Sequence, residues 1–562
     1  MSDSADVVHA TARNCSPGGK RSWPYIICAS LLAALILWPG RASIPPIDRD
    51  ESRYAQATRQ MLETHDFVDP RFQNHPRYVQ PAGVYWTQAV AVSLLGDATH
   101  RAIWPHRVPS WLAGVVSAAL TCAIGARLFG PLAGLAGAAL LASSVLFGFE
   151  ARIATTDATL LALVLLAQWA LLVVWQARDG PDRSRVHAAL FWSALGCAVM
   201  VKGPIGLVWV ALTGAALSAS GREWRWLRRL HPLLGVSLLA AIVLPWMVAI
   251  AVRTNGAFFE QALGHNMLGK LSRGQESHWG PPGYYLAIFA VMFWPGSLLA
   301  ANAAPGVWRA RSTPGVRFLL CWIVPGWLLF ALVPTKLPQY VLPAYPAVAL
   351  LCVGAPSVIL RRRWQQVALK VARGIWLALG VVLALGGPLL LWWCSLGGRP
   401  MEWLAACVEV VLVVAAARTA SSGHTLPAVA CGVAASAIFQ AATFGVILPA
   451  LTPIWISPRV AALVAASSRC PRTTLVSASY SEPSLVFLLG TQTQLADPVS
   501  AAEDIVRAPA CTLALVDASR LTPFLAVVAA HHMVVRDRGT VSGRDYSNNR
   551  RLTLHLFSAA AP

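Results

Sequence analysis

Long apolar runs separated by short polar loops recur along most of this chain, and they predict membrane-spanning helices. The runs lie at residues 23–39, 107–128, 131–149, 158–176, 187–201, 204–219, 232–252, 284–303, 315–333, 340–358, 374–394, 402–418 and 426–448. Because a helix needs about 20 apolar residues to cross a bilayer, this pattern predicts about thirteen crossings. A further apolar run at 84–95 has about half the required length, and we expect a re-entrant or surface helix there.

The polar segment Asp48–Trp86 follows directly on the first apolar run and differs from its surroundings. It concentrates charged side chains: Asp48, Asp50, Glu51, Glu63, Asp66, Asp69, Arg49, Arg53, Arg59, Arg71 and Arg77. From Glu51 to Leu62 the apolar residues fall on one helical face, so Asp50 lies where that helix would begin. We expect the helix to lie along the membrane. Polar residues beside a span suggest a site at the bilayer surface.

The Lys and Arg residues between the apolar runs predict an orientation. Arginine-rich clusters occupy alternate loops, at 178–185, 222–229, 309–317 and 361–373. The positive-inside rule assigns these loops, and the N-terminus, to the cytoplasm. The loops that hold Asp50, Glu150, Asp157, Lys202 and Lys336, together with the long loop 253–283, then face the opposite side. If 84–95 were counted as a span, every later loop would be assigned to the other side of the membrane.

The pattern changes beyond about Ala450, where short apolar stretches alternate with polar turns, as in TTLVSASY and CTLALVDAS. Helix-like stretches follow at 483–490 and 519–530, which indicates a small α/β domain. We therefore expect a transmembrane region at 1–450, with its first non-cytoplasmic loop at 42–106. The α/β domain would occupy 451–562, on the same non-cytoplasmic side.

Composition excludes a water-soluble globular protein, since 56% of the 562 residues are hydrophobic and 12% are charged. The formal charge of +20 could suggest a nucleic-acid partner, but the basic residues form short clusters between apolar runs, which indicates membrane orientation. The 11 cysteines include no CxxC pair and predict neither a zinc site nor a disulfide framework. Trp38–Arg41 offers no small-x-small cleavage site, so we expect the first span to stay uncleaved.

Two acidic positions are candidates for chemistry. Asp50 and Glu51 could pair with Arg49 and Arg53 as a solvated charge cluster, or supply a catalytic carboxylate at the membrane surface. Asp157 precedes a long apolar run and could serve as a helix N-cap. It emerges, however, on the same predicted face as Asp50, which favours a shared site.

Buried cations are the second kind of candidate. Lys202 in VKGPIG and Lys336 in PTKLPQY lie in tight proline-containing turns between apolar runs. An unpaired ammonium there is costly, so each should have an anionic partner, either a carboxylate of this chain or a bound phosphate. A carboxylate with several cations on one membrane face suits the transfer of a group from a lipid phosphate.

The loop 253–283 adds further polar groups, namely His265, Lys270, Arg273, Glu276 and His278. Two histidines and a glutamate could bind a metal, but their spacing is irregular. We assign no metal ligand and no cofactor, and a divalent metal ion stays an open alternative.

Five motifs taken in order resemble a known family: DRDESRYAQATRQML, EARIATTDATLL, KGPIGL, TKLPQYVLPAYPAVAL and SYSEPSLVFLLG. Together they are similar to the bacterial GT-C glycosyltransferases, specifically the group of the dolichyl-phosphate-mannose protein mannosyltransferases (family 39) and the aminoarabinose lipid A (ArnT-like) transferases. The resemblance covers about Pro45–Leu351 and touches the C-terminal domain. It implies a polyprenyl-phosphate-sugar donor, a periplasmic active site, juxtamembrane helices in the first periplasmic loop and a periplasmic C-terminal α/β domain.

The resemblance also implies roles for individual residues. Asp50 matches the family's catalytic carboxylate and Asp157 its second-loop acid, so we predict both as catalytic. Lys336 and Tyr340 match positions that face the lipid phosphate, and Glu51 and Arg53 match structural or substrate contacts. The full set predicted to contact substrate is Glu51, Arg53, Tyr54, Lys202, His265, Lys270, Arg273, Lys336 and Tyr340.

One position departs from the family pattern. Aminoarabinose transferases usually have Lys-Pro in the segment that here reads YVQPAGVYW, so Gln80 replaces a cation expected to contact the lipid phosphate. Arg77, Lys202, Lys270 and Arg273 are the alternatives that could supply this charge.

These observations predict an α-helical polytopic GT-C protein of the bacterial inner membrane. It would move one pentose or hexose from undecaprenyl phosphate to a periplasmic acceptor such as lipid A, a glycan or a protein, with inversion at the anomeric carbon. A protein O-mannosyltransferase-like acceptor is one alternative. Others are a transporter of the lipid-linked sugar, an O-antigen ligase or polymerase, and a membrane scaffold. We expect membrane lipids as partners and no nucleic acid.

Overall fold

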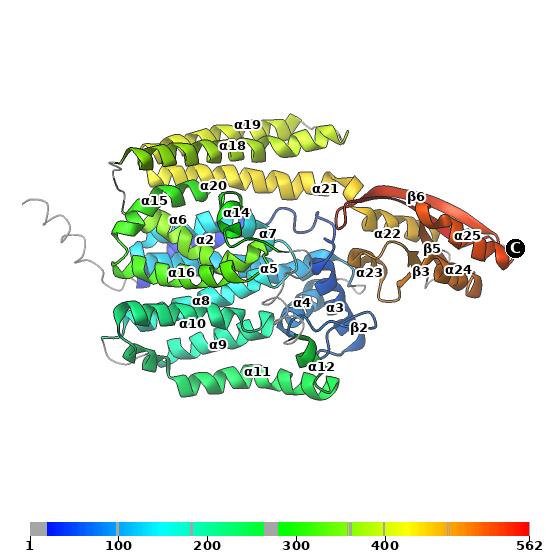
Figure 1. Cartoon of the computed structure of the whole chain (residues 1–562), viewed down its shortest axis with the longest axis horizontal. Coiled ribbons are helices and arrows are strands. Elements are labelled where there is room, and N and C mark those ends of the chain that lie inside the picture. The colour runs from blue at the N-terminus through cyan, green and yellow to red at the C-terminus, as the bar shows by residue number, and fades with distance from the viewer. Residues whose placement is uncertain are drawn as a thin grey trace, which may run out of the picture.

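The computed structural model describes residues 19–96, 100–179, 184–262, 279–356, 358, 362–396, 400–468, 470 and 473–560. It shows a bundle of helices with a smaller sheet-containing region attached to one end (Figure 1). The polar segment after the first helix lies at that same end, between the bundle and the sheet region (Figure 1).

Within the described residues, seven helices are long and apolar enough to cross a membrane. They are α5 (Ile103–Phe129), α8 (Asp157–Gln176), α11 (Pro232–Thr254), α16 (Pro314–Leu332), α18 (Arg363–Trp393), α19 (Pro400–Ser421) and Thr425–Ala450, which joins α20 (Thr425–Ala442), η4 (Thr443–Ile447) and α21 (Leu448–Ala450). α14 (Tyr284–Met292) and α15 (Ser297–Arg309) would make an eighth span if counted together. The chain is therefore a multi-pass membrane protein, whereas the predicted count of thirteen crossings is not confirmed.

Other predicted spans form shorter or broken helices. The remaining bundle helices are α2 (Gly19–Ile36), α6 (Pro131–Ser143), α7 (Val145–Glu150), α9 (Arg185–Lys202), α10 (Ile205–Gly221), η3 (Pro338–Ala344) and α17 (Tyr345–Gly354). The run at 131–149 breaks at Ser144, whose backbone is extended. The run at 284–303 bends by 120° between α14 and α15. Pro295 lies at this break, where it has no N–H to continue the helical hydrogen bonds.

The arginine-rich loops meet at one end of the bundle. Arg178 pairs with Glu223 at 3.5 Å, and Arg229 donates a hydrogen bond to the carbonyl of Ala177. The guanidinium of Arg317, near the start of α16, lies 5.5 Å from the ring centroid of Trp175. Three of the four predicted basic loops therefore adjoin one another. The positive-inside rule requires this, because it assigns these loops to the same side of the membrane.

α3 (Asp50–Thr64) and α4 (Gly83–Leu95) lie together at the opposite end, beside the sheet region (Figure 1). The apolar face of α3, with Tyr54 and Met61, packs on Val84 and Tyr85 of α4. The helix predicted at 51–62 is confirmed, and it begins at Asp50. α4 has 13 residues, too few to span a bilayer, as predicted. A two-strand ribbon, β1 (Arg71–Phe72) with β2 (His75–Pro76), and α12 (Ala257–Phe259) complete this end.

The C-terminal region contains a five-stranded sheet in the order β4-β3-β5-β7-β6. Its strands are β3 (Thr474–Ala478), β4 (Gln494–Ala496), β5 (Thr512–Asp517), β6 (Val535–Asp545) and β7 (Arg550–Ala559). β3 pairs in parallel with β4 and β5, whereas β7 is antiparallel to β5 and β6. The mixture of parallel strands and helices confirms the predicted α/β character.

Helices cover both faces of this sheet. They are η5 (Thr452–Ile454), α22 (Ile456–Ser467), α23 (Pro483–Leu489), α24 (Pro498–Arg507), η6 (Ala518–Arg520) and α25 (Leu521–Ala530). α22 and α23 bury Val460 and Leu485 against one face, with Leu513 of β5. α24 and α25 bury side chains against the other face, which carries Val476 and Ala514. Neighbouring strand residues thus alternate between two apolar layers.

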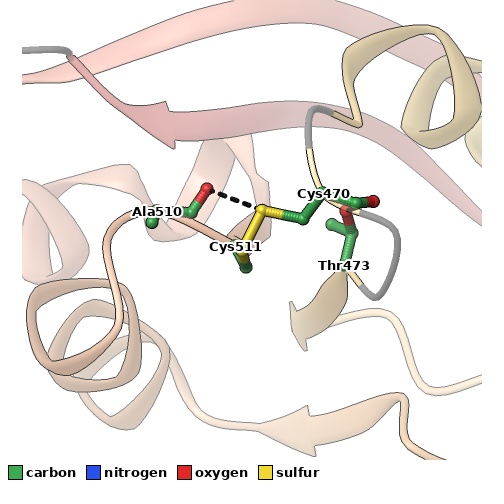
Figure 2. The surroundings of a disulfide bond; sticks show 4 residues. All are labelled: Cys470, Thr473, Ala510 and Cys511. Atoms are coloured by element: carbon green, nitrogen blue, oxygen red, sulfur yellow. Dashed lines mark hydrogen bonds between the residues drawn. A yellow bond between two sulfur atoms is a disulfide. The ribbon is translucent and has the colours of Figure 1, made fainter.

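A disulfide joins Cys470, before β3, to Cys511, before β5 (Figure 2). The Cα atoms are 5.6 Å apart, and 41 positions separate the two cysteines in the sequence. The expectation that the cysteines form no disulfide framework is therefore wrong for this pair. No local motif marks it, because the two cysteines come together only when β3 and β5 pair in the sheet.

Replacing both Cys470 and Cys511 with serine should destabilise the sheet region. Closing a loop of this length restricts the unfolded chain by about 4 kcal/mol in the chain-entropy model. Thermal melting of the full-length protein, followed by limited proteolysis and mass spectrometry of fragments from 456–560, would measure the loss. Cys407→Ser, at an exposed free cysteine in α19, is the control. Unchanged protease resistance in the double variant would contradict the prediction.

Candidate active site

Asp50 is the first residue of α3, and its carboxylate faces solvent. The side chain is 68% exposed, and Oδ1 lies 3.8 Å from Nη2 of the buried Arg77. The Arg77 guanidinium lies over the Tyr54 ring at 4.7 Å, and its Nε donates to the hydroxyl of Tyr85 at 3.2 Å. Arg77 Nη2 makes no hydrogen bond within the described part of the chain. A fixed cation with an unused donor therefore stands beside an accessible carboxylate.

Asp157 and Lys202 form the second polar element. Asp157 opens α8 and Lys202 ends α9, which brings Nζ to 2.5 Å from Oδ1. Each side chain is only 10% exposed. Thr156 occupies the N-cap position of α8, so Asp157 is not the N-cap, and its carboxylate forms the ion pair instead. A carboxylate of this chain and a bound phosphate were the two partners predicted for Lys202, and the structure shows the carboxylate, that of Asp157.

The two polar elements are linked by a hydrogen bond from the N–H of Ala154, three residues before Asp157, to Glu51, the residue after Asp50. Burial is the main cause that raises the pKa of Tyr54, and the negative charges of Asp50 and Asp157 add to the effect. Tyr54 thus lies within electrostatic reach of both carboxylates. Tyr340 lines a small pocket of about 10 Å³ with Asp157 and Lys202, which is room for about one water molecule.

Glu51 has a different environment from its neighbour. Its carboxylate forms a two-point ion pair with Arg107, with Nε to Oε1 at 2.8 Å and Nη2 to Oε2 at 2.7 Å. It also accepts hydrogen bonds from the backbone N–H groups of Ile47 at 2.9 Å and Ala154 at 2.8 Å. Both charged side chains are almost completely buried. The solvated charge cluster predicted as an alternative is therefore wrong for Glu51, whose contacts here are structural.

Through Arg107, the Glu51–Arg107 ion pair (called the anchor below) also contacts the chain before α3. It donates to the backbone carbonyls of Arg41 at 2.9 Å, Ile44 at 2.7 Å and Pro45 at 3.0 Å. A single buried pair thus connects α3, α5, the preceding loop and the turn that leads to Asp157. Arg107 was missed because a lone arginine at the start of an apolar run has no motif around it.

Lys336 contacts no carboxylate in the described structure. Its ammonium donates to the carbonyls of Phe330 at 3.2 Å, Ala331 at 2.7 Å and Val333, at the end of α16. An ammonium has three N–H donors, and these three carbonyls accept them. Of the two partners expected for Lys336, no carboxylate of the described residues is present, and its contact with a lipid phosphate stays a prediction.

The other predicted site residues are spread around this centre. Arg53 is exposed on α3, and its charge lowers the pKa of Glu482 against the larger effect of burial. Tyr54 is buried, with its ring centroid 5.6 Å from that of Tyr85. His265, Lys270, Arg273, Glu276 and His278 lie outside the described residues. Among the residues that are described, no group of three His, Cys, Asp or Glu side chains could hold a metal ion.

Polar contacts join the sheet region to the start of α3. The backbone N–H of Asp48 donates to the Tyr546 hydroxyl at 2.7 Å, and Asp48 Oδ1 accepts from the N–H of Ser484 at 3.1 Å. Arg49 donates to the carbonyl of Ser547. Because these partners lie far apart in the sequence, no local pattern could have predicted the contacts.

The middle of α3 is also held by the sheet region. Gln56 Nε2 donates to Thr491 Oγ1 at 2.8 Å, and Arg59 Nη1 donates to the carbonyl of Phe487 at 2.9 Å. The helix that begins with Asp50 is therefore fixed on one side by α4 and on another by the C-terminal region.

We expect Glu51→Gln to destabilise the protein by about 3–5 kcal/mol, because it leaves Arg107 buried without its counter-charge. Thermal unfolding in detergent, read by size-exclusion chromatography, would measure this loss. Arg53→Gln changes an exposed charge on the same helix and should leave the melting temperature nearly unchanged. Equal melting of wild type and Glu51→Gln would argue against the anchor.

The contact between Asp48 and the sheet region should strengthen as pH falls. Burial raises the pKa of Asp48 from 3.8 to about 6. A raised pKa means that the docked state favours the protonated acid, so stability declines as pH rises from about 4 through 6. The groups around Asp48 are Ser484, Tyr546, Asp545, Tyr480 and Glu482. Burial raises the pKa of Glu482 to about 7, which acts in the same direction.

Hydrogen exchange of α23 amides in the full chain, corrected for intrinsic rates between pH 5 and 7.5, would test this expectation. Protection should decrease with rising pH in wild type and less so in Asp48→Asn. Identical pH dependence in the two proteins would show that Asp48 does not contribute.

Comparison with known proteins gives sequence relatives for part of the chain. The family model described as dolichyl-phosphate-mannose-protein mannosyltransferase matches residues 79–248. An undecaprenyl phosphate-alpha-4-amino-4-deoxy-L-arabinose arabinosyl transferase of Pseudomonas paraeruginosa is 30% identical over 343 residues, 59% of each chain. A protein of the same name from Edwardsiella ictaluri is 27% identical over 334 residues, again 59% of each chain. The matches thus span less than two thirds of these relatives.

Solved structures match nearly the whole chain. ArnT from Cupriavidus metallidurans bound to undecaprenyl phosphate has a TM-score of 0.73 at 20% identity, covering 94% of this chain and 97% of that one. The archaeal oligosaccharyltransferase AglB from Archaeoglobus fulgidus has a TM-score of 0.51 at 12% identity, covering 92% and 69%. At these identities the likeness establishes the fold. The fold of this chain is therefore similar to that of ArnT, and its sequence relatives agree with the resemblance stated from its motifs.

Proposed function

We propose that this protein is an inner-membrane glycosyltransferase that moves one sugar from an undecaprenyl-phosphate donor to a periplasmic acceptor such as lipid A. The observation that carries the proposal is the exposed Asp50 carboxylate beside Arg77, together with the buried Asp157–Lys202 pair. Glu51, the residue after Asp50, is hydrogen-bonded to Ala154 in the turn that leads to that pair. The likeness to relatives named as undecaprenyl phosphate-aminoarabinose arabinosyl transferases supports the donor class. The likeness to ArnT bound to undecaprenyl phosphate supports it as well.

The reaction would be a single displacement with inversion. An acceptor oxygen attacks the anomeric carbon, the bond from that carbon to the phosphate oxygen breaks, and undecaprenyl phosphate leaves with the electron pair. Asp50 takes the proton of a hydroxyl acceptor, and the cations stabilise the leaving phosphate. If the acceptor is itself a phosphate, no strong base is needed, and Asp50 orients the acceptor or binds a cation.

Arg77 is the residue that we propose in place of the family lysine lost at Gln80. Its Nη2 has an unused donor, and Tyr54 and Tyr85 hold the guanidinium in position. An arginine fixed in this way suits a phosphate oxygen. The Lys202 ammonium already donates to the Asp157 carboxylate, so a phosphate would have to share Lys202 with Asp157. Lys336 directs its donors to carbonyl groups.

We propose that the active site and the sheet region face the periplasm. The arginine-rich loops at the far end of the bundle support this orientation. The Cys470–Cys511 disulfide gives independent support, because disulfides persist in oxidising compartments and are rare in the cytosol. On this assignment 1–450 is the transmembrane glycosyltransferase domain with its first periplasmic loop at 42–106, and 451–562 is the periplasmic domain.

A protein hydroxyl is the second candidate acceptor, since the matched family model describes protein mannosyltransferases. A transporter of the lipid-linked sugar is less compatible with the geometry. Transporter sites lie near the bilayer midplane, whereas Asp50, Asp157 and Lys202 all lie at helix ends.

Asp50→Asn should lower sugar transfer by about 10²–10⁴-fold, the usual contribution of a general base, while the protein still inserts and folds. Mass spectrometry of lipid A, polyprenyl-phosphate glycans and periplasmic glycoproteins from a deletion strain, complemented by each variant, measures transfer and identifies the acceptor. Asp66→Asn is a matched control, because an amide oxygen can still accept the turn hydrogen bonds from Val68 and Asp69.

Three outcomes distinguish a transferase that uses Asp50 as its base, a transferase that does not, and a transporter. Loss of one sugar from one acceptor, restored by wild type and Asp66→Asn only, supports the transferase with Asp50 as its base. Near-normal transfer by Asp50→Asn eliminates the base role. Unchanged acceptors, with lipid-linked sugar accumulating on one membrane face, would favour transport and overturn the proposal.

A further inference from the structure

A cavity of about 320 Å³ lies in the bundle away from the candidate active site. α15, α17, α18, α19 and the start of α20 contribute to its wall. Its apolar lining includes Leu298, Leu299 and Ala420. None of the active-site residues described above lines it. No part of the proposed transfer reaction therefore uses this cavity.

Two cations stand at the rim of the cavity. Lys370 and Arg373 are three residues apart on α18, so they share one helical face. Lys370 is exposed and Arg373 half-buried. Neither forms an ion pair with a described carboxylate, and no acidic residue is among the described residues that line the cavity. The rim therefore carries positive charge that the described protein does not neutralise.

The two cations lie where lipid headgroups would be. α18 has 31 residues and is about 46 Å long at 1.5 Å per residue, more than the roughly 30 Å of a hydrocarbon core. Its continuous apolar part begins at Gly374, directly after Arg373. Trp364 and Trp308 at the same end are 63% and 70% exposed, typical of an interfacial aromatic belt. Lys370 and Arg373 therefore mark the boundary between headgroups and acyl chains.

Polar groups suited to a phosphodiester complete the cavity. Asn302, Ser421 and Thr425 supply an amide and two hydroxyls from three different helical segments. A ligand that fits must combine a negative charge, hydrogen-bonding oxygens and an apolar tail. A free anion would leave the apolar wall unused, and a neutral lipid would leave the cations unpaired.

We propose that this cavity binds an anionic glycerophospholipid of the leaflet opposite the active site. Its phosphate would contact Lys370 and Arg373, and its acyl chains would lie along the wall formed by α15 and α19. Basic pockets between helices at a membrane surface bind acidic lipid headgroups through the same combination of charge and apolar contact. Because the ligand bridges α15, α18 and α19, it should stabilise their packing.

The test compares lipid binding by the delipidated full-length protein and by Lys370→Gln/Arg373→Gln. We expect phosphatidylglycerol to bind the double variant roughly 30-fold more weakly, since each cation near an anionic lipid surface contributes about 1 kcal/mol. Native mass spectrometry would count bound lipids. Thermal melting with increasing lipid would report binding independently, because a ligand of the folded state raises the Tm.

Arg225→Gln/Arg228→Gln is the matched control. It removes two exposed cations with the same three-residue spacing, from η1 (Arg225–Leu230) at the same end of the bundle. This control and wild type should bind phosphatidylglycerol equally, and phosphatidylethanolamine should bind both weakly. Equal binding by the Lys370/Arg373 variant would overturn the proposal. An equal rise in Tm with inorganic phosphate would assign the cavity to a small anion instead of a lipid.

Discussion

The buried ion pair between Glu51 and Arg107 is the constraint on which the geometry of the candidate site depends. Removing two charges from water is costly, and only complete pairing compensates that cost. Here the carboxylate accepts four hydrogen bonds and the guanidinium donates to three carbonyls as well. Such a pair adds less to stability than to specificity, since few other arrangements could satisfy every group.

That specificity determines where the exposed acid stands. Glu51 follows Asp50 directly, so fixing one residue on the buried side of the helix start leaves the other directed to solvent. The same carboxylate holds the N–H of Ala154, only three residues before Asp157. One buried group thus positions the starts of both α3 and α8. The two neighbouring acids therefore have different environments. Glu51 is buried and stabilises the fold, whereas the Asp50 carboxylate is exposed and available for chemistry.

The spacing of apolar and polar residues in the sequence was sufficient to predict helices and strands that form from neighbouring residues. The helix from Asp50, the short helix at 83–95 and the α/β sheet region follow from apolar periodicity, and the Lys202 ammonium needed an anion, which Asp157 supplies. The partner of Glu51 and the Cys470–Cys511 bond depend on tertiary approach. The carbonyls around Lys336 are three to six residues away, and they face the ammonium because of how the chain turns after α16. Apolar run length could not reveal the breaks at Ser144 and Pro295, because backbone geometry decides them.

The contacts between α3 and the sheet region also constrain the order in which the molecule can mature. Asp48 and Tyr546 are 498 positions apart, and Arg59 and Phe487 are 428 apart. During synthesis the helix that carries Asp50 emerges near the beginning, yet its docking partners are made almost last. A truncated or stalled chain would keep the contacts of α3 with α4 and Arg107 but lack those with the sheet region. The complete set of contacts around Asp50 can therefore form only after the C-terminal region has been made.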